Sequence, residues 1–147
     1  MRRFVFDYCG SVVTLMASKP MQRSLKHLKD TGWTVAVVEK WKHFPGMKFG
    51  VRQDVWGFGD ILACRLSWTD SFLDNGVLTT KDRREIALIQ TTDWTSISKH
   101  RAKILAIPEF EKWKDAGGLV LLHGWKLRPK DGVRGAKKVW TLKQEIL

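Results

Sequence analysis

Two short stretches, GFGDILAC (residues 57–64) and ALIQTT (residues 87–92), decide how we expect the chain to fold. The first stretch contains the apolar run ILAC, and the second overlaps the apolar run IALI (residues 86–89). Both runs are typical of buried strands. Each run borders a side chain that bears oxygen: Asp60 precedes the first and Gln90 follows the second. Because Mg²⁺ prefers oxygen ligands, we expect the two side chains to meet at a metal site on neighbouring strands.

The flanking sequence predicts further helices and strands around this pair. Ser18 can cap a helix that has Pro20 in its first turn and ends at Gly32. The β-branched residues of WTVAVVEKW (residues 33–41) predict a strand that ends near Glu39. The run at residues 4–17 fits a strand or a buried helix equally well, because it is short.

The second half of the chain continues the mixed pattern. Strands are predicted at about 60–66 and 85–92, joined by an Asp-Asn-Gly hairpin connection at 74–76. Two helices follow, one capped by Thr95 or Ser96 and ending before Pro108, the other over 109–116. The last two predicted elements are a buried strand, GLVLLHGW (118–125), and an edge strand, VWTLKQEIL (139–147). We therefore expect a single α/β domain with a central mixed sheet flanked by helices.

Charge and cysteine content narrow the class of protein. The 147 residues carry a net charge of +11, which favours an anionic partner, with nucleic acid ahead of a membrane surface. A merely solvated basic surface, or a contact with an acidic protein, is the alternative. Cys9 and Cys64 make neither a disulfide framework nor a zinc site, and we expect Cys64 in the core of an intracellular protein. Residues 11–17 are too short to span a bilayer, so no membrane association is expected.

The order of elements also resembles a known family. A carboxylate opening the second core strand and an (E/Q)-x-(K/T/S) triplet on the third, here Gln90-Thr91-Thr92, resemble the PD-(D/E)XK nuclease superfamily over about residues 20–127. Within it the chain looks closest to phage and archaeal Holliday junction resolvase-like proteins. The resemblance implies a restriction-endonuclease-like core and a Mg²⁺- or Mn²⁺-dependent endonuclease that hydrolyses branched DNA during recombination. It also implies a homodimer, and a cytoplasmic location in a bacterial host of the phage.

The resemblance implies a role for each site residue. Asp60 takes the position of the central metal ligand, Gln90 that of the usual Glu, and Thr92 that of the usual Lys, whose charge a threonine lacks. Glu39 or Asp54 would add an acidic ligand, and Lys99, Lys103 or Lys40 would replace the missing lysine. The expected catalytic residues are Asp60, Gln90, Thr92, Glu39 and Lys99, and the expected metal ligands are Asp60, Gln90, Glu39 and Asp54.

Each of these residues also has a structural explanation. Asp60 can be a strand-entry residue, Asp54 can pair with Arg52 on the surface, and Thr92 is simply a good strand former. Two other functions therefore stay open: a nuclease-fold DNA-binding protein without catalysis, and a basic phage structural protein.

A set of basic residues predicts the nucleic-acid face, because such charges bind phosphates without reading sequence. The set is Lys48, Arg52, Lys99, Arg101, Lys103, Arg128, Lys130, Arg134, Lys137 and Lys138. Trp56, Phe58 and Trp68 flank the expected site, and one of them is a candidate for stacking on an unpaired base. Trp33, Trp113, Trp125 and Trp140 are expected in the core. His100 and His123 are weak candidates for acid–base roles, and His123 is expected to be a satisfied strand residue.

Overall fold

The structure is a computed structural model that describes residues 18–147, except residues 44, 47, 49, 75 and 76 and the side chains of residues 41 and 68–82. The ambiguous run at residues 4–17, with its apolar part at 11–17 and Cys9, lies outside the described residues. No helix within the described part of the chain is long and apolar enough to cross a membrane.

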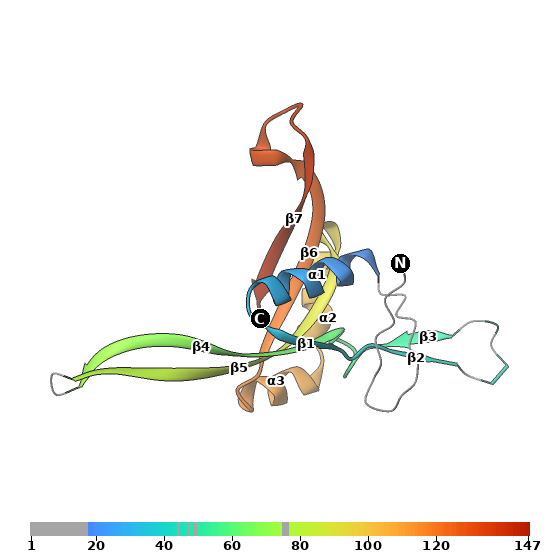
Figure 1. The fold of residues 1–147 in the computed structure, drawn as a ribbon. Coiled ribbons are helices and arrows are strands. Elements are labelled where there is room, and N and C mark those ends of the chain that lie inside the picture. The colour runs from blue at the N-terminus through green and yellow to red at the C-terminus, as the bar shows by residue number, and fades with distance from the viewer. Residues whose placement is uncertain (1–17, 44, 47, 49, 75–76) are drawn as a thin grey trace, which may run out of the picture.

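A five-stranded mixed sheet forms the centre of the fold, in the order β1-β4-β5-β6-β7 (Figure 1). Strand β4 pairs antiparallel with β1 and β5, β5 pairs parallel with β6, and β6 pairs antiparallel with the edge strand β7. The strands are β1 (Thr34–Val37), β4 (Ile61–Asp74), β5 (Val77–Asp93), β6 (Leu119–Pro129) and β7 (Lys138–Ile146). The crossover between β5 and β6 is made by η1 (Trp94–Ser96), α2 (Ile97–Leu105) and α3 (Pro108–Asp115).

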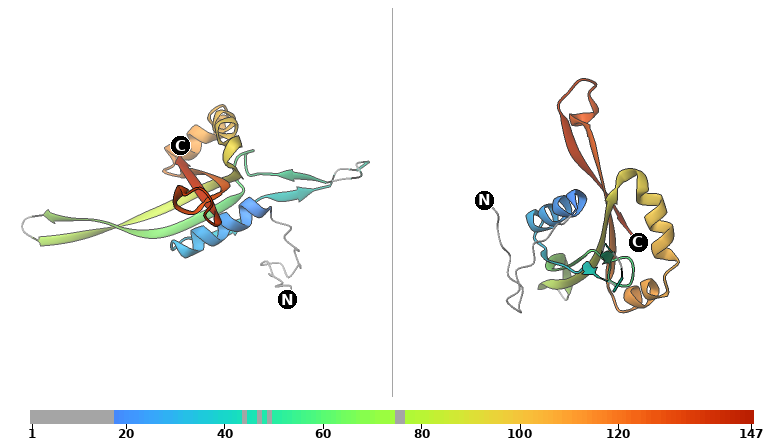
Figure 2. Two further views of the ribbon diagram at one scale, coloured as in Figure 1. Left: turned by 90° about the horizontal axis from the view of Figure 1, so that it is seen from above. Right: turned by 90° about the vertical axis from the view of Figure 1, so that its right-hand side faces the viewer.

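Helices cover both faces of the sheet, which confirms the predicted α/β class (Figure 2). Helix α1 (Lys19–Asp30) lies on one face, and α2 and α3 lie on the other. The α1 side buries Met21, Leu28, Trp33, Ile61, Ala63, Ala87, Ile89 and Leu121. The α2 side buries Phe58, Leu88, Ile97, Ile104, Phe110, Val120 and Leu122. Alternate residues of β5 thus enter opposite cores, as the period of two in a strand requires.

A chain of buried polar groups ties α1 to β6 and β7. Trp125 donates its Nε1–H to the hydroxyl of Ser24 at 2.9 Å, and that hydroxyl lies 3.1 Å from Nδ1 of His123. The other ring nitrogen of His123 lies 3.1 Å from the side-chain oxygen of Gln144. Burial lowers the pKa of His123 to about 4, so the ring is neutral at pH 7. A neutral ring that donates to Gln144 and accepts from Ser24 satisfies the whole chain, and His123 is a satisfied strand residue as expected.

The β4–β5 and β6–β7 hairpins are longer than predicted and project beyond the helices (Figures 1 and 2). Strand β4 continues to Asp74 and β5 begins at Val77, so the predicted connection at 74–76 lies at the far end of a long ribbon. The predicted strand over residues 33–41 is divided in two. Its second part, β2 (Lys40–Lys42), pairs with β3 (Val51–Gln53) in a separate two-stranded sheet.

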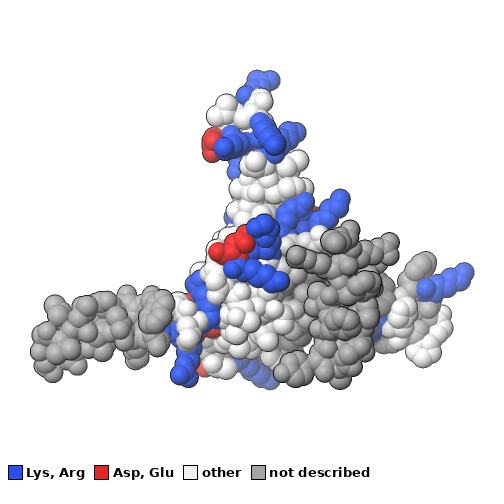
Figure 3. All heavy atoms as spheres, viewed as in Figure 1, with Lys and Arg blue, Asp and Glu red and all other residues white. Residues whose placement is uncertain are grey.

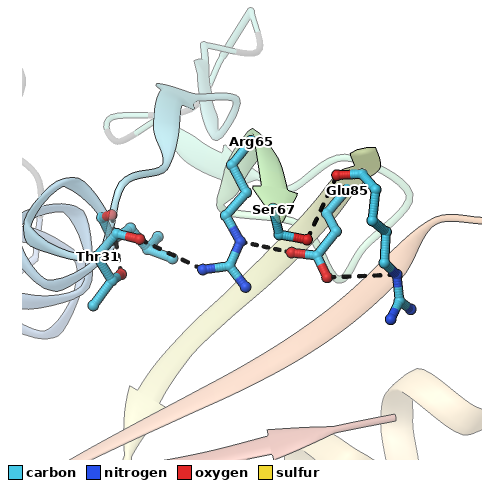
Figure 4. A network of polar contacts seen from close by, with 6 residues as sticks. Thr31, Arg65, Ser67 and Glu85 are labelled. Atoms are coloured by element: carbon cyan, nitrogen blue, oxygen red, sulfur yellow. Dashed lines mark hydrogen bonds and ion pairs between the residues drawn. The ribbon is translucent and has the colours of Figure 1, made fainter. Parts of the chain in front are cut away.

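Charged groups fix the root of the β4–β5 hairpin against the end of α1 (Figure 4). Arg65 donates to Glu85 across the hairpin at 2.6 Å and reaches the backbone oxygen of Thr31 at 3.5 Å. Its guanidinium lies 4.2 Å from the ring centroid of Trp33. The expectation that Cys64 is a core residue is wrong: it is exposed, because the hairpin has left the cover of the helices at this point.

Candidate metal centre

Asp60 stands where three strands meet. Its backbone N–H donates to the carbonyl of Ile89 on β5 at 3.0 Å. Its own carbonyl accepts from the N–H groups of Val38 and Glu39 at 3.0 and 3.3 Å. The residue is only 4% exposed. These bonds hold the entrance of β4 between the end of β1 and the second half of β5, so the position of the carboxylate is fixed by the sheet itself.

One oxygen of the Asp60 carboxylate collects three hydrogen bonds. Oδ2 accepts from the Gln90 amide at 2.9 Å, from the Thr91 backbone N–H at 2.7 Å and from the Thr91 hydroxyl at 2.8 Å. Burial nevertheless raises the pKa of Asp60 from 3.8 to about 6, against the opposing bonds from Thr91. The nearby Asp54 and Glu39 carboxylates raise the pKa further.

Two more carboxylates converge on the same point. Glu39, Asp54 and Asp60 each have a ligand atom within 4.8 Å of those of the other two. Glu39 lies between β1 and β2, directly before Lys40, where the predicted strand is divided in two. Burial raises its pKa, and the neighbouring Arg52, at 3.6 Å, opposes that rise.

A tight turn over residues 54–59 brings Asp54 back to Asp60. The turn is closed by a bridge between Val55 and Gly59 and contains Trp56 and Gly57 at positive φ, 52° and 80°. Phe58 anchors it in the core on the α2 side with no exposed surface. The expectation that Phe58 can stack on a base is therefore wrong, whereas Trp56 is half exposed. The side chain of Trp68 lies outside the described residues.

Gln90 places a fourth side chain that bears oxygen beside the three carboxylates. The side chain is 4% exposed and lies against Asp60, yet its amide oxygen has no hydrogen-bond partner among the described residues. A buried carbonyl oxygen without a partner is unfavourable by about 1–3 kcal/mol. Together with the three carboxylates it makes a donor set of oxygen atoms, which fits Mg²⁺ or Mn²⁺. The residues predicted as metal ligands, Asp60, Gln90, Glu39 and Asp54, are thus brought together.

Thr92, at the position of the usual lysine, is 8% exposed. It shares the α2 side of β5 with Gln90, since the two are two positions apart in the strand. Lys99 and Lys103 lie on α2, and their charges act on His100, as does the carboxylate of Asp54. Lys40 is on β2, opposite Gln53.

Thr91 is the residue whose contact with Asp60 the sequence did not indicate. It supplies two donors to the carboxylate, its backbone N–H and its hydroxyl. A threonine in a strand is too common for a pattern to single it out. His100, a predicted candidate for an acid–base role, has a buried Nδ1 that lacks a hydrogen-bond partner in the described part of the chain. Burial lowers the pKa of His100, followed in effect by Lys103, while Asp54 raises it.

The predicted basic face is distributed over three places. Lys48 and Arg52 belong to the β2–β3 region, and Lys99, Arg101 and Lys103 belong to α2. Arg128, Lys130, Arg134, Lys137 and Lys138 lie on the β6–β7 hairpin and its loop, where all five are exposed. Arg101 is held by Glu145 of β7, with bonds of 2.8 and 2.6 Å, so much of its charge is neutralised.

The expectation that Trp140 lies in the core is wrong, because the residue is 46% exposed. It carries the guanidinium of Arg23, 3.6 Å from the ring centroid. Trp33 and Trp125 are buried as expected, and Trp113 is partly buried and donates to the carbonyl of Leu119 at 2.8 Å.

Comparisons with known proteins add no relative: no family model, no curated protein and no solved structure matches the chain.

Proposed function

We propose that the protein is a metal-dependent, structure-selective DNA endonuclease that resembles Holliday junction resolvases and hydrolyses phosphodiester bonds. The observation that carries the proposal is the meeting of Glu39, Asp54 and Asp60 within 4.8 Å, beside the buried and unpartnered amide oxygen of Gln90. Three carboxylates at this distance repel one another, and a bound divalent cation would offset that repulsion.

The chain's own groups fit the task of holding a divalent ion. Thr91 fixes Asp60 through Oδ2, which leaves the other carboxylate oxygen for a cation. Mg²⁺ held there would acidify a water molecule, polarise the scissile phosphate and stabilise the leaving oxygen. Lys99 and Lys103 would supply the positive charge that Thr92 lacks. His100, whose pKa is lowered mainly by burial and which interacts electrostatically with Asp54, is a candidate for the general base.

The topology supports the same proposal. A helix, three antiparallel strands, two helices and a strand parallel to the third is the order that the resemblance to PD-(D/E)XK nucleases implies. The sheet ends in β7 as an edge strand, which is a place for a second subunit to pair, as symmetric cutting of branched DNA requires. We therefore propose branched DNA as the substrate and a homodimer as the working form.

A second candidate function rests on Thr92. A buried threonine hydroxyl cannot stabilise the charge of a phosphate as an ammonium group does. If no other residue supplies that charge, the protein would bind DNA without cutting it. The basic hairpin and α2 would serve both functions, and the two differ only in whether metal and cleavage are linked.

Cleavage of labelled four-way junction, flap and linear duplex DNA in Mg²⁺ or Mn²⁺ tests the proposal. We expect metal-dependent cutting of branched DNA that is lost in Asp60→Asn and strongly reduced in Gln90→Ala. Asp115→Asn, on the exposed end of α3, is the matched control and should cut as the unchanged protein does.

Metal binding is measured separately, from the concentration of free Mn²⁺ determined by electron paramagnetic resonance. Cleavage that persists in Asp60→Asn would refute the assignment of the site. Salt-sensitive DNA binding without cleavage, by a protein that still binds Mn²⁺ through Asp60, would establish the second candidate instead.

A further inference from the structure

The outer part of the β6–β7 hairpin, residues 126–141, is the most basic segment that the structure describes, and we call it the arm. It carries six basic residues, all exposed, and one acidic residue, Asp131. The arm projects beyond the helices, and lysine and arginine side chains gather over it (Figures 1 and 3). No second layer covers it in the views of the ribbon (Figure 2).

Strand register shows which side of the arm each charge occupies, because directly paired residues point to the same side. Gly124 pairs with Lys143, Lys126 with Thr141 and Arg128 with Val139. A Cβ added to Gly124 would lie 2.2 Å from Ile97 of α2, so this row faces the α2 side of the sheet.

The same row begins at the candidate metal centre. Gln90 pairs with Leu122 in the parallel ladder, and Thr92 pairs with Gly124. Lys126 lies four residues beyond Leu122 and Arg128 lies six beyond it. At roughly 3.3 Å per residue these side chains stand about 13 and 20 Å from the level of Gln90. Helix α2 covers this row at Leu122 and Gly124, so Lys126 and Arg128 emerge beyond the helix, on the side of the sheet that carries the carboxylates.

An aromatic platform orders the cations on this side. Trp94 of η1 has the guanidinium of Arg128 at 5.4 Å and the ammonium group of Lys143 at 5.9 Å from its ring centroid. Such cation–π contacts hold a charge in place while leaving its donors available. On this row Glu145 pairs with Leu122, below the arm, and is bound by Arg101 and Lys143. The residues of the row that belong to the arm, Lys126, Arg128, Val139 and Thr141, include no carboxylate.

We propose that the α2-facing side of the arm, formed by Lys126 and Arg128, is a track for the phosphates of a DNA duplex. The duplex would run from the carboxylate centre along the arm for about 20 Å, or roughly six base pairs at 3.4 Å each. The distance to the cutting point rests on the proposed function, whereas binding of the duplex by the arm does not. Contacts of this kind hold the backbone and do not read sequence.

The opposite side of the arm does not offer the same surface. There Leu127 pairs with Trp140 and Pro129 with Lys138. Two of these residues are large apolar side chains, and Trp140 already carries Arg23. An elongated partner with regularly spaced negative charges therefore fits the α2-facing side, where the spacing of the cations follows the strand.

The test compares Lys126→Gln/Arg128→Gln with a pair of equal charge loss, Lys26→Gln/Lys29→Gln, on exposed positions of α1. Binding of a labelled 30-base-pair DNA duplex is measured by fluorescence anisotropy in EDTA, so that no cutting occurs, over a range of NaCl concentrations. We expect the arm pair to flatten the slope of log K against log salt by about 1.8 and to weaken binding by up to about 60-fold at 0.1 M salt. Lys126→Arg/Arg128→Lys should restore the slope, because it keeps both charges.

A hydroxyl-radical footprint on a four-way junction, whose branch point fixes the register of the bound protein, tests the track itself. We expect protection about six base pairs from the cutting point to disappear in the arm pair alone. An unchanged slope in the arm pair, or an equal loss in the α1 pair, would overturn the proposal, as would tighter binding of an RNA duplex of the same sequence. If the arm pair loses binding while Asp60→Asn still cleaves DNA, the proposal for the arm is supported and only the assignment of the nuclease site is refuted.

Discussion

Replacing the buried carboxylate of Asp60 by an amide should stabilise the protein in the absence of metal. In the fold the pKa of Asp60 is raised from 3.8 to about 6, mainly by burial. A raised carboxyl pKa means that the folded state holds a proton more tightly than the unfolded chain. Stability from this group is therefore greatest below pH 4, falls as the pH rises from about 4 to 6, and stays low above that.

The size of the effect follows from the two pKa values. A difference of about 2 pKa units is worth about 3 kcal/mol in the free energy of unfolding, shared with Glu39 and Asp54 because their charges contribute to the rise. For a chain of this length that corresponds to a shift of roughly 6–12 °C in Tm. Asp60→Asn keeps an oxygen that can accept from Thr91 but carries no charge. We expect it to melt higher than the unchanged protein at pH 8 in EDTA.

Metal should reverse the order of the two proteins. Mg²⁺ at 1,000 times its Kd stabilises the binding form by about 4.1 kcal/mol, and Asp60→Asn should gain little of this. That gain exceeds the advantage of about 3 kcal/mol that Asp60→Asn has without metal. Thermal melts followed by circular dichroism, at pH 4.5 and pH 8 with EDTA or MgCl₂, measure all four conditions. Asp115→Asn serves as the control. Equal melting of Asp60→Asn and the unchanged protein at pH 8 in EDTA would refute the reasoning, as would a difference of the same size at pH 4.5.

Three further predictions concern the packing around the centre. The His123 pKa is lowered from 6.5 to about 4, so the unchanged protein should lose about 3 kcal/mol as the pH falls from 6.5 towards 4, and urea unfolding of His123→Gln should show a flatter profile. Ser24→Ala leaves the buried Nε1–H of Trp125 without its acceptor and should lower the free energy of unfolding by about 1–3 kcal/mol, measured in the same way. Gly124→Ala places a methyl group 2.2 Å from Ile97, so we expect a loss of about 1–3 kcal/mol, and a Tm equal to that of the unchanged protein would contradict the close packing of α2 on β6.

The apolar strands and the first helix could be predicted because each has a local signal. Ser18 occupies the N-cap of α1 and Pro20 lies in its first turn, as the sequence indicates. The runs around Ile61 and Ile89 form neighbouring strands in direct register, and this neighbourhood is what brings Asp60 to Gln90. A pattern of apolar residues thus predicted both the strands and the pair of side chains beside them.

The outer halves of the two long hairpins could not be predicted in this way. The outer parts of the hairpins include stretches such as TTKDRR (residues 79–84) and KLRPKD (residues 126–131), which lack the alternation of apolar and polar residues that predicts a half-buried strand. The break in the predicted strand at residues 38–39 depends on backbone bonds to Asp60, which no local sequence encodes. The exposure of Trp140 has another cause. Strand β7 belongs to a hairpin that projects beyond the helices, and no local pattern predicts that projection.

The long two-stranded hairpins also give the molecule a gradient of local stability. A ribbon without a second layer has few buried apolar contacts, and its amide protons exchange through small local openings rather than through global unfolding. The amides around Asp60 lie between neighbouring strands and beneath a packed helix, so their exchange requires the sheet itself to open. The chain therefore joins a centre with a fixed geometry to a ribbon that can adjust to the curvature of a partner. Ordering that ribbon on a partner would lower its conformational entropy and so would offset part of the favourable energy of the contacts.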